Sequence, residues 1–178
     1  MTMTIETQTI PPDDLQRRLT LVRPNEDQNL PHIGLAGDTY TILLKGEDMA
    51  GRYCLIDMFV PHGGGPPPHR HDFEEMFAIL EGEIEVTFRG AKSVVRAGET
   101  ANIPANAPHH FRNVSERTAR LLCICSPAGQ EELFQSVGIS VSSRTAPAPK
   151  LDKSAQAALK AKAEALAPQY RSEFLPSL

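Results

Sequence analysis

Two neighbouring stretches of the sequence decide the fold: GGGPPPHRHDFEEMFAILEG at residues 63–82 and GETANIPANAPHHFRN at residues 98–113. The first stretch contains His69, His71 and Glu75, and the second contains His109. Because alternate residues of a strand point to the same side, a strand through these odd-numbered positions places two imidazoles and one carboxylate on one face. His109 must come from another strand, which a barrel can bring opposite.

This donor set predicts a metal site. Three neutral imidazoles and one carboxylate suit a divalent ion of the first transition series and leave coordination positions open for water or substrate. Two solvated strand histidines are the ordinary alternative for the His-x-His pair alone, but Glu75 and His109 favour the metal site. We expect one divalent ion, with Fe, Mn, Ni, Co, Cu and Zn all compatible, on the ligands His69, His71, Glu75 and His109.

The surrounding sequence alternates between short β-like runs and turn signals. The expected strands cover residues 40–45, 52–61, 74–81, 83–88, 92–96 and 119–125. Glycine and proline separate these runs, above all in the loop 63–68 and at the turns around Gly82 and Gly98. Short strands at such spacing are typical of a sandwich or a barrel.

On these positions the sequence resembles the cupin superfamily. The first cupin motif corresponds to Gly63, His69, His71, Glu75 and Gly82, and the second corresponds to Gly98, Pro104, His109 and Asn113. The resemblance implies an all-β double-stranded β-helix, the cupin jelly-roll barrel. Asn106 stands where the family usually has glycine, and asparagine tolerates the positive φ of such a turn better than other side chains do.

We expect three regions along the chain. Residues 1–32 form an N-terminal extension, residues 33–127 the cupin barrel, and residues 128–178 a C-terminal helical tail. A short helix is expected over residues 14–21 with Asp13 as its cap. An alanine-rich helix is expected over residues 152–167, stopped by Pro168, with an apolar face that covers the barrel or a neighbouring subunit.

Composition excludes several classes of partner. The 178 residues carry 18 Lys and Arg against 22 Asp and Glu, a net charge of −4, which disfavours nucleic acid as a partner. No apolar run is long enough to span a membrane, and Met1–Ile10 lacks the features of a secretory signal, so the cytoplasm is the expected location. The three cysteines, Cys54, Cys123 and Cys125, are expected in the core rather than in disulfides, redox sites or metal sites.

The residues of the first motif further resemble those of quercetin-dioxygenase-like cupins. This resemblance implies a dioxygenase for a small phenolic or enol-type substrate, with Glu75 as general base, and it also implies a homodimer with exchanged N-terminal segments. A metal-dependent isomerase or lyase for a small polar substrate and a non-enzymatic binding cupin remain the alternatives. The apolar residues in phase with the ligands favour an aromatic or apolar substrate, although core packing explains them equally well: Phe73, Phe77, Ile79 and Phe111.

Several other polar residues lie near the motifs. We expect the side chain of Asn113 to hydrogen-bond to nearby backbone groups and so close the local turn. We expect His62 and His110 to lie outside the metal site. One of three residues before the first motif is a candidate for substrate contact, and the sequence does not choose among them: Arg52, Tyr53 and Asp57.

Overall fold

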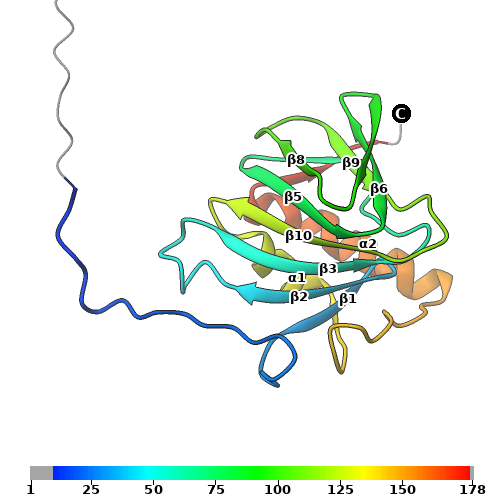
Figure 1. Ribbon diagram of the computed structural model, residues 1–178. Helices are drawn as coiled ribbons and strands as arrows, with labels where there is room; N and C mark the ends of the chain where they lie inside the picture. The colour runs from blue at the N-terminus through cyan, green and yellow to red at the C-terminus, as the bar shows by residue number, and fades with distance from the viewer. Residues whose placement is uncertain (1–9, 177–178) are drawn as a thin grey trace, which may run out of the picture.

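The computed structural model describes residues 10–176, which form two antiparallel sheets packed face to face (Figure 1). The larger sheet has the spatial order β11 (Ile139–Ser140), β1 (His32–Leu35), β2 (Asp38–Leu44), β3 (Cys54–Val60), β10 (Ala119–Ser126), β5 (Glu74–Glu81) and β8 (Thr100–Ile103). The smaller sheet has the order β12 (Ser172–Phe174), β4 (His69–His71), β9 (His109–Arg112), β6 (Glu83–Phe88) and β7 (Ala91–Arg96). This architecture confirms the predicted all-β jelly roll.

The core lies between the two sheets and follows the alternation of the strands. Every second residue of β10 is fully buried, and the intervening residues are partly covered. The rings of Phe77 on β5 and Phe111 on β9 meet edge to face across the core, with centroids 5.1 Å apart. Each such fully buried side chain stabilises the fold by about 1.5–3 kcal/mol. Phe73 and Ile79 are buried in the same cluster, so the apolar residues in phase with the ligands do pack in the core.

The turns that shape the barrel agree with the motif. Asn106 adopts a φ of 67°, so it holds the turn in which the family usually has glycine. Its N–H donates to the carbonyl of His71 at 2.7 Å, which ties this turn to β4. Asn113 is fully buried, and its amide donates to the carbonyls of Val60 and Arg117 at 2.8 and 2.7 Å. The expected role of Asn113 in closing the local backbone is confirmed.

The prediction that one strand carries His69, His71 and Glu75 is wrong. β4 ends at His71, and the chain then crosses from the smaller sheet to the larger sheet before β5 begins at Glu74. The backbone N–H of Asp72, in this crossing, donates to the carbonyl of Arg171 at 2.9 Å, which extends the pairing of β4 with β12 by one residue before the chain changes sheets. The three side chains still converge, because both sheets turn their inner faces toward the same interior.

The prediction of a helix over residues 14–21 is also wrong. This segment makes only a turn at Leu15 and Gln16 and otherwise runs without regular structure. Its leucines are exposed, with 73%, 91% and 62% of the accessible surface free at Leu15, Leu19 and Leu21. An isolated helix of this length is marginal in water, and these leucines find no core here that would stabilise it.

The tail contains the expected alanine-rich helix together with further helices and two short strands. α1 (Gln130–Val137) and α2 (Lys153–Leu166) are followed by the 3-10 helix η1 (Ala167–Tyr170). Asp152 caps α2 by accepting the N–H of Ala155 at 2.8 Å. The tail also supplies the short strands β11 and β12, which join opposite sheets. Within residues 10–176 no helix is both long and apolar enough to cross a membrane.

Candidate metal centre

The four predicted ligands meet in the interior of the barrel, although they come from three strands. His69 and His71 lie on β4, Glu75 on β5 and His109 on β9, and all four are buried. One ligand atom from each residue lies within 4.8 Å of all the others. His69 and His109 are direct partners in the β4–β9 ladder, which explains why residues so distant in sequence face one another.

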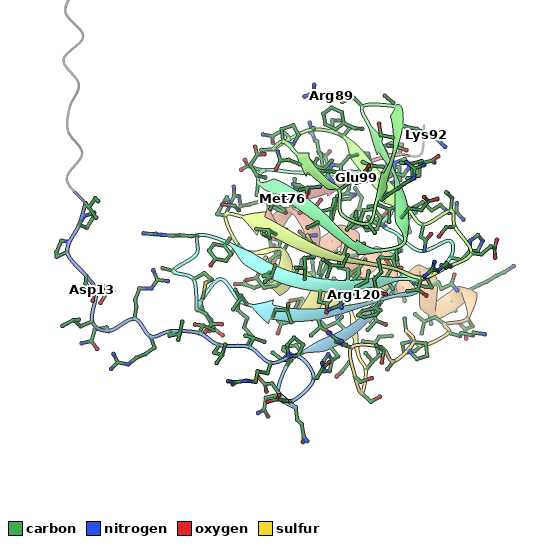
Figure 2. The ribbon with its side chains drawn as sticks, viewed as in Figure 1. Asp13, Met76, Arg89, Lys92, Glu99 and Arg120 are labelled. Carbon is green, nitrogen blue, oxygen red and sulfur yellow. The ribbon has the colours of Figure 1, made fainter. Side chains whose placement is uncertain are left out.

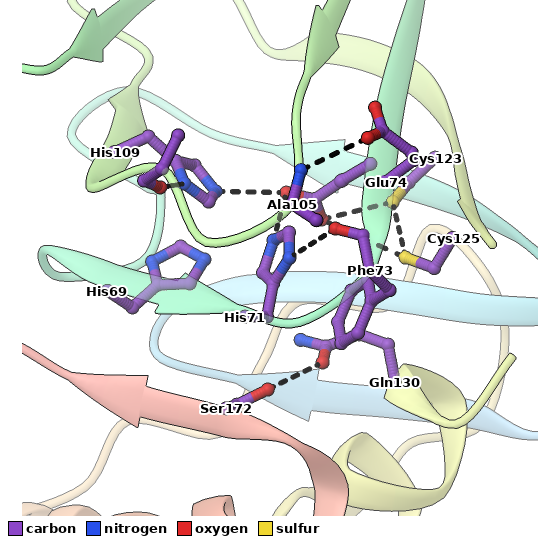
Figure 3. Close-up of polar contacts among 12 residues, drawn as sticks. His69, His71, Phe73, Glu74, Ala105, His109, Cys123, Cys125, Gln130 and Ser172 are labelled. Atoms are coloured by element: carbon purple, nitrogen blue, oxygen red, sulfur yellow. Dashed lines mark hydrogen bonds and ion pairs between the residues drawn. The ribbon is translucent and has the colours of Figure 1, made fainter. Parts of the chain in front are cut away.

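Local backbone contacts determine which ring nitrogen of each of the three imidazoles carries a hydrogen (Figure 3). A carbonyl oxygen can only accept, so a ring nitrogen beside it must carry the hydrogen. Each Nδ1 lies 2.8–2.9 Å from such an oxygen, in the pairs His69 with Pro67, His71 with Phe73, and His109 with Ala107. Figure 3 draws the contact of His71 with Phe73. A neutral ring held in this way presents the lone pair of Nε2, which is the form in which histidine binds a metal.

The carboxylate of Glu75 faces the Nε2 atoms of two of these rings. Its Oε2 lies 3.1 Å from Nε2 of His71 and 3.1 Å from Nε2 of His109. Burial would raise the pKa of Glu75, but its contacts with His109 and His71 outweigh burial and hold the pKa below the usual carboxyl range. Burial also lowers the pKa of His69 to about 4, so this ring is neutral at pH 7. Acceptors that face each other at this distance need a shared proton or a shared cation, and the donor set therefore fits a divalent metal ion.

The second oxygen of Glu75 contacts two thiols. Cys123 Sγ lies 3.4 Å and Cys125 Sγ 4.0 Å from Oε1, and the two sulfurs are 3.6 Å apart. The contact with Cys125 lowers the pKa of Cys123, but burial and the charge of Glu75 together have the larger effect and raise this pKa to about 12. The thiol is therefore protonated, and it orients Glu75 by donating a hydrogen bond to Oε1. Cys54, Cys123 and Cys125 are buried, as predicted. The contact of Cys123 and Cys125 with Glu75 was not predicted, because it depends on the β5–β10 register.

A cavity of about 1150 Å³ opens above His69 and Glu75. The barrel contributes Tyr40, Met58 and Phe111 to its lining. The tail forms the opposite wall through apolar side chains of α1, α2 and β12: Leu133, Leu159 and Phe174. Gln130 and Ser172 are polar residues that line the same cavity and are themselves buried. The candidate metal centre thus lies at the inner end of a largely apolar chamber that the barrel and the tail build together.

Residues 56–125 match the cupin domain family. This part of the chain is a cupin domain. Over 99 residues this cupin is 29% identical to quercetin 2,3-dioxygenase of Bacillus subtilis, an alignment that covers 55% of this chain and 29% of that enzyme. It is 28% identical over 116 residues to an uncharacterized protein of Methanocaldococcus jannaschii, covering 64% of this chain and 93% of that protein. The cupin therefore spans less than a third of the Bacillus enzyme.

Solved structures share the fold at low sequence identity. KdgF from Halomonas sp. has a TM-score of 0.56 at 16% identity, and the match covers 65% of this cupin and 99% of that chain. The polyketide cyclase RemF from Streptomyces resistomycificus has a TM-score of 0.53 at 22% identity, covering 78% and 91% of the two chains. These likenesses extend the jelly-roll assignment to a large part of this cupin.

The remaining sequence candidates lie outside the cavity of this cupin. Asp57 is fully buried on β3, where Arg120, labelled in Figure 2, binds both of its carboxylate oxygens at 3.0 Å. Arg144 adds a contact at 3.2 Å. Arg52 and Tyr53 are exposed before β3, and none of the three residues lines the cavity. The other histidines that the structure describes are outside the donor cluster, as expected for His62 and His110.

Proposed function

We propose that this cupin is a metal-dependent dioxygenase for a substrate that carries an enol or phenol oxygen on an apolar body. The buried cluster of three histidines and one glutamate at the end of an apolar cavity is the observation that carries the proposal. Convergent polar groups in an otherwise apolar cavity are typical of an active site. The similarity to quercetin 2,3-dioxygenase over the barrel region supports the oxygenase class.

His69, His71, Glu75 and His109 are the residues that would hold the ion. A bound divalent transition metal supplies Lewis acidity toward the substrate oxygen and, if it is redox-active, an electron path to O₂. Glu75 takes the role of general base in this proposal, because it is the ionised carboxylate within the donor cluster. In this role its carboxylate loosens from the ion to accept the proton of the substrate hydroxyl, while Cys123 contacts Oε1.

The cavity favours an apolar substrate over a small polar one. The barrel side of its lining includes Tyr40, Met58 and Phe111. A phosphorylated or strongly charged substrate would need converging basic groups at this depth. The lysines of the lining, Lys150 and Lys160, are exposed and belong to the tail. This arrangement supports the dioxygenase over the isomerase or lyase alternative.

Oxygen uptake by the metal-loaded protein tests the proposal. We expect uptake with at least one member of a panel of phenols, flavonols and diketones. Glu75→Gln should lower the rate ~10²–10⁴-fold at matched metal occupancy, because a neutral amide cannot accept the proton. Glu74→Gln is the matched control, since Glu74 is exposed and bonds Asn102 outside the cavity, and it should leave the rate unchanged.

Two results would contradict parts of this proposal. Turnover near the wild-type rate in metal-saturated Glu75→Gln would show that the proton goes elsewhere. Tight binding of panel compounds without any oxygen uptake would favour the non-enzymatic binding cupin.

A further inference from the structure

The tail brings one buried amide to the cavity beside the candidate ligands. Gln130 is the first residue of α1, is only 5% exposed, and lines the cavity. Its Oε1 accepts from the hydroxyl of Ser172 at 3.5 Å, and that hydroxyl also contacts the carbonyl of Tyr170 at 3.2 Å. Within residues 10–176 no hydrogen-bond acceptor is found for its Nε2. Nε2 is also absent from the buried side-chain atoms that lack a partner, so it is reached from the cavity and is free to donate to a ligand there.

Strand register places this amide close to the metal ligands. Ser172 on β12 is the direct antiparallel partner of His71 on β4, and Phe174 is the partner of His69. Directly opposite residues of an antiparallel pair project from the same side of a sheet. Ser172 therefore shares the inner side with His71, and the ring of Phe174 lies 6.4 Å from that of His69. Figure 3 shows Gln130 and Ser172 beside His71.

Ion pairs hold β12 in this position. Arg70 on β4 binds Glu173 on β12 at 2.6 Å, and Arg171 binds Asp72 at 3.3 Å. The N–H of Leu175 donates to the carbonyl of Pro68 at 2.8 Å, which extends the pairing beyond the strand. Ser172, and through it Gln130, is thus fixed relative to the ligand strand rather than carried on a loose tail.

We propose that Gln130 is a substrate-binding residue whose amide donates a hydrogen bond to the ionised oxygen of the substrate in front of His69 and Glu75. Ser172 is a positioning residue that holds the amide by its oxygen. This inference rests on the proposed function and adds the tail to the recognition of an enolate or phenolate. A donor at this point favours the ionised form of the substrate over the neutral one, because a hydrogen bond to a charged acceptor is the stronger one.

The binding of 4-nitrocatechol to the full chain loaded with Co²⁺ tests this role without turnover. The probe is a coloured phenol, so its absorption reports ionisation directly. Gln130→Met keeps the size of the side chain but removes the donor, and it should weaken binding about tenfold or more. Gln130→Glu should weaken binding further at neutral pH and recover as the pH falls. Ser172→Ala should have an intermediate effect, which Ser172→Thr reverses because it restores the hydroxyl.

A matched control separates this role from general damage to α1. Gln135→Leu changes an exposed glutamine on the same helix and should leave binding of the probe unchanged. Cobalt content should be equal in all variants. Equal dissociation constants for Gln130→Met and the wild type, or unchanged binding by Gln130→Glu, would overturn the role of Gln130 while leaving the proposed function intact. A wild-type chain that loads cobalt but does not bind the probe would overturn both.

Discussion

Each ligand histidine is oriented by its own neighbourhood in the chain. The carbonyl that holds Nδ1 lies two residues away from the histidine in all three cases. The orientation of each imidazole is therefore set by local sequence, whereas the meeting of the three rings is set by strand pairing. This division explains why spacing alone identifies the ligands: the motif constrains the local turn, and the barrel supplies the rest.

Asp38 gives the protein a pH dependence that is separate from the metal centre. It is fully buried on β2 and accepts the hydroxyl of Tyr40 at 2.8 Å. Burial outweighs this contact and raises the pKa of Asp38 from 3.8 to about 7. A raised pKa in the folded state means that the contribution of this group to stability is complete below its unfolded pKa and is lost as the pH rises toward 7.

We therefore predict that Asp38→Asn stabilises the protein at about pH 8, by on the order of a few kcal/mol, and much less at about pH 5. The amide retains the acceptor for Tyr40 and cannot ionise. Urea unfolding of both proteins at the two pH values measures the difference. Stability curves of the wild type and the variant that stay parallel across this range would contradict the buried, protonated state of Asp38.

At the scale of elements, the strands with strong local patterns were predicted well. The expected runs 74–81 and 83–88 coincide with β5 and β6, because alternating apolar residues and flanking glycines define them locally. β12 was not predicted, since its three residues carry no pattern and its pairing with β4 spans most of the chain. The position of the polar residues Gln130 and Ser172 in the cavity lining could not be predicted for the same reason, because it depends on contacts between the tail and the barrel.

The cap of α2 gives a prediction at this scale. No residue of α2 is fully buried, so the helix depends more on its cap than on core packing. Asp152→Ala should remove about 1 kcal/mol from the helix and make its amides exchange with solvent about fivefold faster. Asp152→Asn keeps the capping acceptor, so it should change neither the stability of the helix nor the exchange rate of its amides. Hydrogen exchange over residues 153–166 measures both, and equal exchange in the two variants would contradict the role of the cap.

At the scale of the whole molecule, residues 10–30 extend away from the barrel (Figure 1). Their exposed leucines, Leu15, Leu19 and Leu21, are the kind of surface that a second copy can cover. We expect a homodimer in which this segment packs on the partner. Light scattering should give twice the 19.5 kDa chain mass, and replacing the three leucines with serine should return the mass to that of one chain. A mass of 19.5 kDa for the wild type across micromolar concentrations would exclude the dimer.

The cavity joins the barrel and the tail, because the barrel supplies the candidate ligands and the tail supplies the opposite wall. Neither the apolar lining nor the role of Gln130 has a function in catalysis unless an ion binds at the four buried donors. Several first-row metals accept three imidazoles and a carboxylate, so the donor set is compatible with each of them.

Metal content of protein purified without a histidine tag tests this central claim most directly. We predict one divalent ion per chain in the wild type and its loss in His69→Ala and His109→Ala, because each removes a donor and several kcal/mol of binding. His110→Ala is the matched control, since His110 neighbours a ligand in sequence but lies outside the cluster, and it should keep the ion. Circular dichroism verifies that each variant is folded. Unchanged metal content in both ligand variants would contradict the assignment of the centre.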